Sequence, residues 1–162
     1  MATPLKSPPA SIPPVIIQKA PFEAGKVIRE VCAHNSNIGA VASFIGLMRD
    51  RNEGDYVERM TLEHYPGMTE KAISEIVDEA RGRWDLINVR VIHRVGELEP
   101  SDPIVLVVVA SSHRADAFEA CEFIMDYLKT RAPFWKKEST RKGERWVESR
   151  ESDREAADRW RK

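Results

Sequence analysis

The run Ile104-Val-Leu-Val-Val-Val-Ala110 constrains the fold of this 162-residue chain more than any other feature. Its β-branched residues favour a strand, and its seven residues are far fewer than the roughly 20 needed to cross a membrane. A strand that is apolar at every position has no face suited to water, so both of its faces must be covered. We therefore predict a layered domain with Ile104–Ser111 inside its sheet and no part in a membrane.

Periodic patterns place further elements around this strand. Strands are predicted over 15–17, 39–48, 57–64 and 88–95, and helices over 24–33, 66–83 and 114–131. Phe134–Ser139 and Glu144–Ser149 flank Arg141-Lys142-Gly143, which predicts a hairpin. Ser152-Asp-Arg-Glu155 has the pattern of a capping box, which predicts a last helix over about 153–160.

The mixture of strands and helices predicts a single α+β domain over residues 15–162, with the hairpin in an additional part. Met1–Pro14 is rich in Pro and Ser and lacks the apolar segment of a secretory signal, so we predict a flexible arm. The two cysteines, Cys32 and Cys121, form no CxxC motif, which favours a reducing cytoplasm. With 42% hydrophobic residues and a net charge of −1, the chain is not predicted to be disordered.

The near-neutral total hides an uneven distribution of charge. Residues 1–128 hold 13 Lys and Arg against 19 Asp and Glu, whereas residues 129–150 hold 8 basic and 3 acidic side chains. A cationic segment on an acidic body indicates a site for a specific anion or an acidic partner. Two alternatives stay open at this point: a solvated basic hairpin, and a nucleic-acid surface on which Trp135 and Trp146 stack against bases.

Three positions carry candidate chemistry. His113-Arg114 follows the buried strand and opens a helix, where free backbone N–H groups attract anions. Lys129 lies near the end of the same helix among other cations, a setting that lowers the pKa of a lysine and lets it act as a base or nucleophile. Arg49 ends a predicted strand, and each position also has an ordinary explanation: a polar helix start, a helix-terminal lysine and a surface arginine. No HExxH or Cys/His cluster is present, so no metal site is predicted.

Several longer motifs resemble one known family. In chain order they are Leu62-Glu-His-Tyr-Pro-Gly-Met-Thr-Glu-Lys-Ala72, His93-Arg-Val-Gly-Glu-Leu98, Ser112-His-Arg114 and Phe123-Ile-Met-Asp-Tyr-Leu-Lys-Thr-Arg-Ala-Pro-Phe-Trp-Lys136. Together they resemble the large, catalytic subunit of molybdopterin synthase over about residues 22–160. The resemblance implies an α/β hammerhead fold and a sulfurtransferase that works without a cofactor or catalytic metal of its own.

The resemblance also implies partners. The subunit is expected to form a homodimer and to bind one small ubiquitin-like sulfur-carrier subunit at each end, which gives a heterotetramer. The thiocarboxylated C-terminus of the carrier is expected to enter a pocket and to deliver two sulfur atoms to cyclic pyranopterin monophosphate. The product is the dithiolene of molybdopterin, and no nucleic acid takes part.

The family's site residues carry over to named positions of this chain. Lys129 and Lys136 match its active-site lysines, and we expect Lys129 to act as acid and base while Lys136 stabilises negative charge. The substrate-binding positions implied by the resemblance are Arg49, His113, Arg114, Arg150, Phe44 and Met125. Within this set, His113 and Arg114 are expected on the phosphate, and Arg150 is expected to reach the site from the other subunit. Leu47-Met48-Arg49 departs from the family's Lys-Val-Arg, so one cation near the pocket is absent.

Two alternatives belong to other classes of protein. A non-catalytic adaptor would only dock a ubiquitin-like tail in a basic pocket, and it should tolerate Lys129→Arg, whereas proton transfer should not. An RNA-binding domain predicts salt-sensitive binding to oligonucleotides, but it gives no reason for the His113-Arg114 pair.

Overall fold

Four strands form the main sheet of the computed structural model, which describes residues 12–148 and 150–161. Their order across the sheet is β1 (Val15–Gln18), β5 (Leu86–Arg94), β7 (Pro103–Ser111) and β2 (Ala40–Leu47). β1 is parallel to β5, and the β5–β7 and β7–β2 pairs are antiparallel. The apolar run of β7 therefore has a neighbouring strand on each side.

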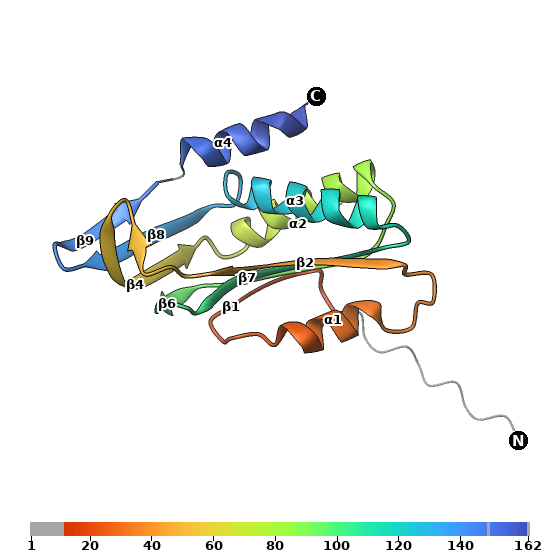
Figure 1. Ribbon diagram of the computed structural model, residues 1–162, viewed down its shortest axis with the longest axis horizontal. Coiled ribbons are helices and arrows are strands. Elements are labelled where there is room, and N and C mark those ends of the chain that lie inside the picture. The colour runs from red at the N-terminus through yellow and green to blue at the C-terminus, as the bar shows by residue number, and fades with distance from the viewer. Residues whose placement is uncertain (1–11, 149, 162) are drawn as a thin grey trace, which may run out of the picture.

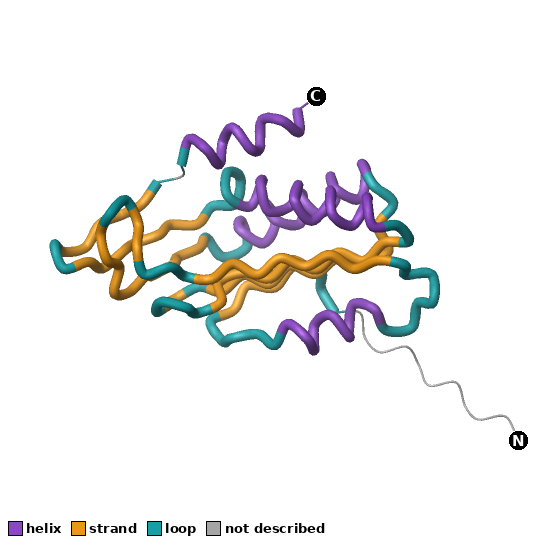
Figure 2. The backbone as a smooth tube through the Cα atoms, in the orientation of Figure 1, coloured by secondary structure: helices purple, strands orange, loops and turns teal. Residues whose placement is uncertain are grey.

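Helices cover both faces of this sheet (Figures 1 and 2). α2 (Met68–Arg83) and α3 (Arg114–Leu128) lie on one face, and α1 (Ala24–Cys32) lies on the other. The side chains of β7 alternate between two cores, with Val107 in the core that includes α2 and α3 and Leu106 in the core that includes α1. Both side chains are completely buried, which confirms the prediction that this strand is covered on both faces.

A second, smaller sheet extends from one end of the first (Figure 1). It contains β3 (Arg51–Asn52), β4 (Asp55–His64), β8 (Phe134–Thr140) and β9 (Gly143–Val147), with β6 (Gly96–Leu98) paired to β4. β8 and β9 form the predicted hairpin, and β8 also pairs with β4. The buried core of this sheet consists of Met48, Val57, Met60, Leu62 and Leu98. The additional hairpin-containing part that the sequence predicts is therefore present.

The C-terminal segment folds back onto α3 (Figure 1). It comprises α4 (Glu151–Asp158) and a 3₁₀ turn, η1 (Arg159–Arg161). The Trp160 ring packs edge-on against Phe123, with ring centroids 5.5 Å apart, and its Nε1 donates to Asp126 Oδ2 at 2.7 Å. These contacts hold the C-terminal segment beside α3.

The structure corrects the prediction at the start of the last helix. α4 begins at Glu151 with Arg150 at its N-cap position and without a side-chain cap, so the predicted capping box at Ser152 is wrong. A capping box depends on four neighbouring residues only, whereas here the guanidinium of Arg150 bonds to Asn52, 98 residues away. That tertiary contact sets where the chain enters the helix.

Other differences concern short elements and boundaries. β3 and β6 were not predicted, because strands of two and three residues are too short for a periodic pattern. α3 ends at Leu128, before the predicted end at Arg131. Residues 1–11 of the predicted arm, and Ser149 at the end of the predicted hairpin, lie outside the described residues, so the arm stays a prediction.

Candidate active site

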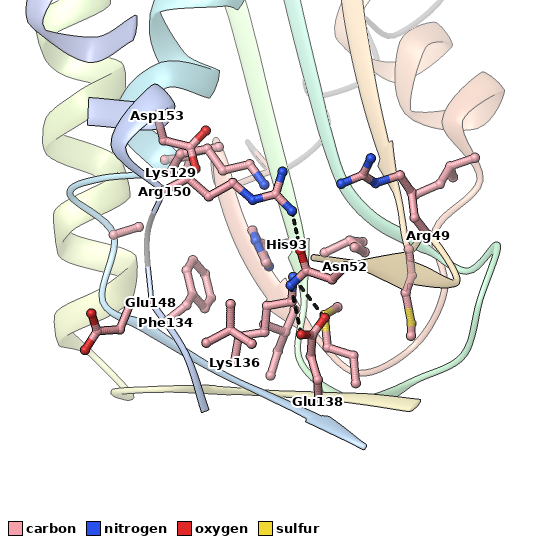
Figure 3. A pocket seen from close by; sticks show the side chains of 18 of the residues that line it. Arg49, Asn52, His93, Lys129, Phe134, Lys136, Glu138, Glu148, Arg150 and Asp153 are labelled. Atoms are coloured by element: carbon pink, nitrogen blue, oxygen red, sulfur yellow. Dashed lines mark hydrogen bonds and ion pairs between the residues drawn. The ribbon is translucent and has the colours of Figure 1, made fainter. Parts of the chain in front are cut away.

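A cavity of about 290 Å³ opens where the second sheet meets the end of β2 and the C-terminal end of α3. β4, β8, β9 and the start of α4 supply its other walls. Four predicted site residues line it, and they come from four separate parts of the chain (Figure 3): Arg49, Lys129, Lys136 and Arg150. The fold therefore concentrates positive charge in one hollow.

The pKa of Lys136 shows that these positive charges interact. Burial lowers its pKa below the ordinary lysine value, and the positive charges of Lys129, Arg150 and Arg49 act in the same direction. The carboxylate of Glu138, 3.8 Å from the Lys136 ammonium, opposes that shift. A lysine in such a setting releases its proton more readily than a lysine on an open surface.

Glu138 places a buried carboxylate in the cavity wall, with 2% of its surface exposed. Asn52 Nδ2 donates to Glu138 Oε1 at 2.8 Å, and Arg145 Nε donates to the same oxygen at 3.3 Å. Arg145 also donates to the carbonyl oxygen of Asn52 at 3.0 Å and to Asp55 Oδ2 at 2.9 Å. Burying a charge is costly unless it is paired and hydrogen-bonded, and this network meets both conditions.

His93 brings a neutral imidazole to the cavity. Its ring stacks on Phe134 with centroids 4.0 Å apart, and Nδ1 lies 2.8 Å from the carbonyl oxygen of Arg94. A carbonyl oxygen only accepts, so Nδ1 carries the hydrogen and Nε2 is an acceptor. Burial lowers the pKa of His93 to about 4, and the positive charge of Lys129 acts in the same direction. At neutral pH this ring therefore adds no further positive charge.

His113 and Arg114 do not join the other predicted residues. They lie at the N-terminal end of α3, whereas Lys129 caps its C-terminal end. The helix has 15 residues and is therefore about 22 Å long. Within one chain the pair lies too far away to line the cavity that contains Lys129.

Phe44 and Met125 are not among the described residues that line the cavity. Phe44 lies on the edge strand β2 and is 42% exposed, and Met125 is buried one helical turn before Lys129. Arg150 lines the cavity of its own chain, whereas the resemblance expects it to reach the site from the other subunit, so that expectation stays a prediction.

Asn52, His93 and Glu138 line the cavity although they had no role in the sequence prediction. Glu138 follows Lys136 by two positions on a predicted strand, and this spacing alone places both side chains on one face. His93 begins one of the family-like motifs. Asn52 lies in a polar segment where no local pattern distinguishes it, so only contacts between distant segments identify it.

The remaining reactive groups lie in ordinary settings. Among residues 12–148 and 150–161, no three His, Cys, Asp or Glu side chains gather as a metal site requires. Both cysteines are free, and burial raises the pKa of Cys121 to about 11, which agrees with a buried, unreactive thiol. In the same part of the chain, no helix combines the length and the apolar character that crossing a bilayer requires.

Comparison with known proteins identifies the same family as the sequence motifs do. The family model described as "MoaE protein" matches residues 17–131. The molybdopterin synthase catalytic subunit of Ralstonia nicotianae is 60% identical over 149 residues, which cover 92% of this chain and 85% of that protein. The chain therefore belongs to the MoaE family, and the resemblance is confirmed.

Solved structures confirm the expected fold class. The molybdopterin biosynthesis MoaE protein from Burkholderia ambifaria matches with a TM-score of 0.79 and 51% identity, covering 92% of this chain and 98% of that one. A chain in the complex of subunits 1 and 2 of molybdopterin-converting factor from Helicobacter pylori matches with a TM-score of 0.66 and 18% identity. That match covers 85% of this chain and 90% of the other, and it shows a shared fold alone.

We expect His93 to stay neutral at about pH 5.5, where an ordinary histidine is mostly protonated. Because its pKa of about 4 in the folded chain lies below the ordinary 6.5, the unfolded chain binds this proton more tightly. The contribution of His93 therefore makes the free energy of unfolding fall as the pH decreases from about 6.5 to about 4. An NMR titration of the ring nitrogens tests this, and a midpoint near 6.5 would contradict it. His93→Gln should flatten the pH dependence of unfolding over the same interval.

Proposed function

We propose that this chain is the catalytic subunit of a molybdopterin synthase and that its cavity carries out sulfur transfer. The observation that carries the proposal is the gathering of five basic side chains in one cavity: Arg49, Arg51, Lys129, Lys136 and Arg150. Neighbouring cations repel one another, and a bound anion relieves that repulsion. The name of the relative that is 60% identical supports the same function.

Both proposed reactants are anions. One is the C-terminal thiocarboxylate of a small ubiquitin-like sulfur carrier, and the other is cyclic pyranopterin monophosphate. Guanidinium groups bind carboxylate-like and phosphate groups through parallel N–H donors, so Arg49 and Arg150 suit both reactants. The sulfur arrives on the carrier, so the proposed reaction uses no redox cofactor or metal held by this chain.

In the proposed mechanism, Lys129 moves protons while sulfur attacks the pterin side chain, the cyclic phosphate opens and water leaves. Lys136 stabilises the negative charge that develops on the reacting groups. Its partial burial supports this role, because charges interact more strongly where water is excluded. In each transfer water hydrolyses the bond between the delivered sulfur and the terminal carbonyl of the carrier, which leaves with an ordinary carboxylate, and two successive transfers produce the dithiolene.

We also propose that a second copy of the chain completes each site. His113 and Arg114 are the expected phosphate ligands, and the length of α3 keeps them away from Lys129 of the same chain. In a homodimer with twofold symmetry, the pair from each copy can serve the cavity of the other, and the two sites are equivalent. One carrier at each site gives a heterotetramer, and the reducing cytoplasm stays the predicted compartment.

Single-turnover conversion of cyclic pyranopterin monophosphate tests the proposed function. The purified chain is mixed with the small carrier subunit bearing a C-terminal thiocarboxylate, and the control is the same carrier with an ordinary carboxylate. We expect dithiolene product with the thiocarboxylate only. Tight binding of the carrier without any product would instead favour the adaptor.

Variants of Lys129 test the proton-transfer role. Lys129→Ala should lower the rate of product formation by at least about a hundredfold, the usual contribution of a positioned acid or base. Lys129→Arg should lose a similar factor, because arginine keeps the charge but does not release a proton at neutral pH. Lys137→Ala is the matched control. Lys137 follows Lys136 in the sequence, but it forms an ion pair with Glu144 and does not line the cavity. Full activity of Lys129→Arg would exclude the proton-transfer role.

Mixed dimers test whether a second copy completes the site. A Lys129→Ala chain and an Arg114→Ala chain should each be nearly inactive alone, and mixing them should restore activity. Random exchange gives one intact site in about half of the dimers, which is about a quarter of all sites. Lys129→Ala mixed with Arg150→Ala should restore none, because both residues serve the same chain's cavity. Restoration in the second mixture but not the first would reverse the assignment.

A further inference from the structure

Asn52 lies at the edge of the cavity in β3, and it is 6% exposed. The polar segment that contains it, Asp50–Asp55, has no motif of its own. An amide side chain in such a segment usually faces water, so its burial requires partners for both its donor and its acceptor. The structure supplies both partners.

The two ends of the Asn52 amide contact two different charged groups. Nδ2 donates to Glu138 Oε1 at 2.8 Å, and Oδ1 accepts a hydrogen bond from Arg150 Nη2 (Figure 3). Within the described residues, Arg150 forms no ion pair with a carboxylate, so this amide is the group that orients its guanidinium. Arg150 is otherwise exposed and lies between β9 and α4.

We propose that Asn52 is a positioning residue that holds the guanidinium of Arg150 in the cavity, where it binds the anionic substrate. The inference rests on the proposed function, because it assigns to Arg150 a contact with that substrate. Asn52 itself need not touch the substrate, since its amide is already occupied on both sides.

The chemistry of an amide suits this task better than that of a carboxylate. Glu138 needs a donor and Arg150 needs an acceptor, and an amide offers both without a charge. An aspartate at this position would place two carboxylates side by side and would neutralise Arg150. The uncharged partner therefore orients the guanidinium and leaves its positive charge available to an anion.

The position of Asn52 is itself firmly held. Arg145 donates to the carbonyl oxygen of Asn52 at 3.0 Å, to Glu138 at 3.3 Å and to Asp55 at 2.9 Å. These bonds tie the β3–β4 turn to the β8–β9 hairpin. Because Asn52 is held in place, a single hydrogen bond from Arg150 to its amide can fix the direction of the long arginine side chain.

The test is a double-mutant cycle between Asn52→Ala and Arg150→Ala, measured as steady-state conversion of cyclic pyranopterin monophosphate with thiocarboxylated carrier. Asn52→Ala alone should raise KM for the pterin about tenfold, with a much smaller change in kcat, because it weakens ground-state binding. In the Arg150→Ala background, Asn52→Ala should have no further effect, since its target is already absent. Equal effects in both backgrounds, or an unchanged KM in the first, would overturn the proposal.

Asn88→Ala is the matched control. The Asn88 amide also makes two hydrogen bonds, to the carbonyl of Val31 and from the N–H of Val89, but it lies outside the cavity. This variant should lower thermal stability and leave KM unchanged. If it raised KM as much as Asn52→Ala, the effect would belong to general stability and the positioning role would be wrong.

A crystal structure of Asn52→Ala gives a readout that does not depend on turnover. The guanidinium of Arg150 should leave its place in the cavity, and an unmoved guanidinium overturns the proposal whatever the activity. A failure of the proposed function would be recognised differently, because the chain without any substitution would then form no product.

Discussion

The burial of β7 on both faces is the constraint on which the rest of the structure depends. The strand needs a neighbouring strand along each of its two edges, and β5 and β2 take these places. It also needs a helical layer over each of its two faces, which α1 forms on one face and α2 and α3 form on the other. Because α3 follows β7 directly and packs back along the same sheet, its two ends lie at opposite ends of that sheet. The same packing therefore separates His113 and Arg114 from Lys129, and it makes a single chain insufficient for the complete proposed site.

The cavity also has an excess of positive charge. Five cations line the cavity against three carboxylates, of which only Glu138 is buried; the cations are Arg49, Arg51, Lys129, Lys136 and Arg150, and the other carboxylates are Glu148 and Asp153. A carboxylate for each cation would form closed ion pairs and would remove the attraction for an incoming anion. The neutral groups fit this pattern, because Asn52 and His93 provide hydrogen-bonding atoms without adding charge of either sign. Burial lowers the pKa of Lys136, and the neighbouring positive charges add to that shift.

The regular elements were predictable because each depends on a periodic pattern within one segment. The hairpin around Gly143 and the helix of α3 were found in this way, and α3 is only shorter than predicted. The predicted capping box at Ser152 failed because a local motif competed with the tertiary contact of Arg150. Asn52 was missed for the related reason that its two partners lie 86 and 98 residues away along the chain.

The sequence by itself determined the buried central strand, the helices that cover it, the cationic segment over residues 129–150 and the motifs of the family. These properties reside in residues that are neighbours along the chain, and their order and spacing are the same before and after folding. Only the tertiary structure decided which cations share a cavity: it placed Arg150 with Lys129 and Lys136, and it kept His113 and Arg114 apart from them. Such distances depend on how two sheets and a helix of about 22 Å pack together, and that packing is a property of the whole chain rather than of any one segment.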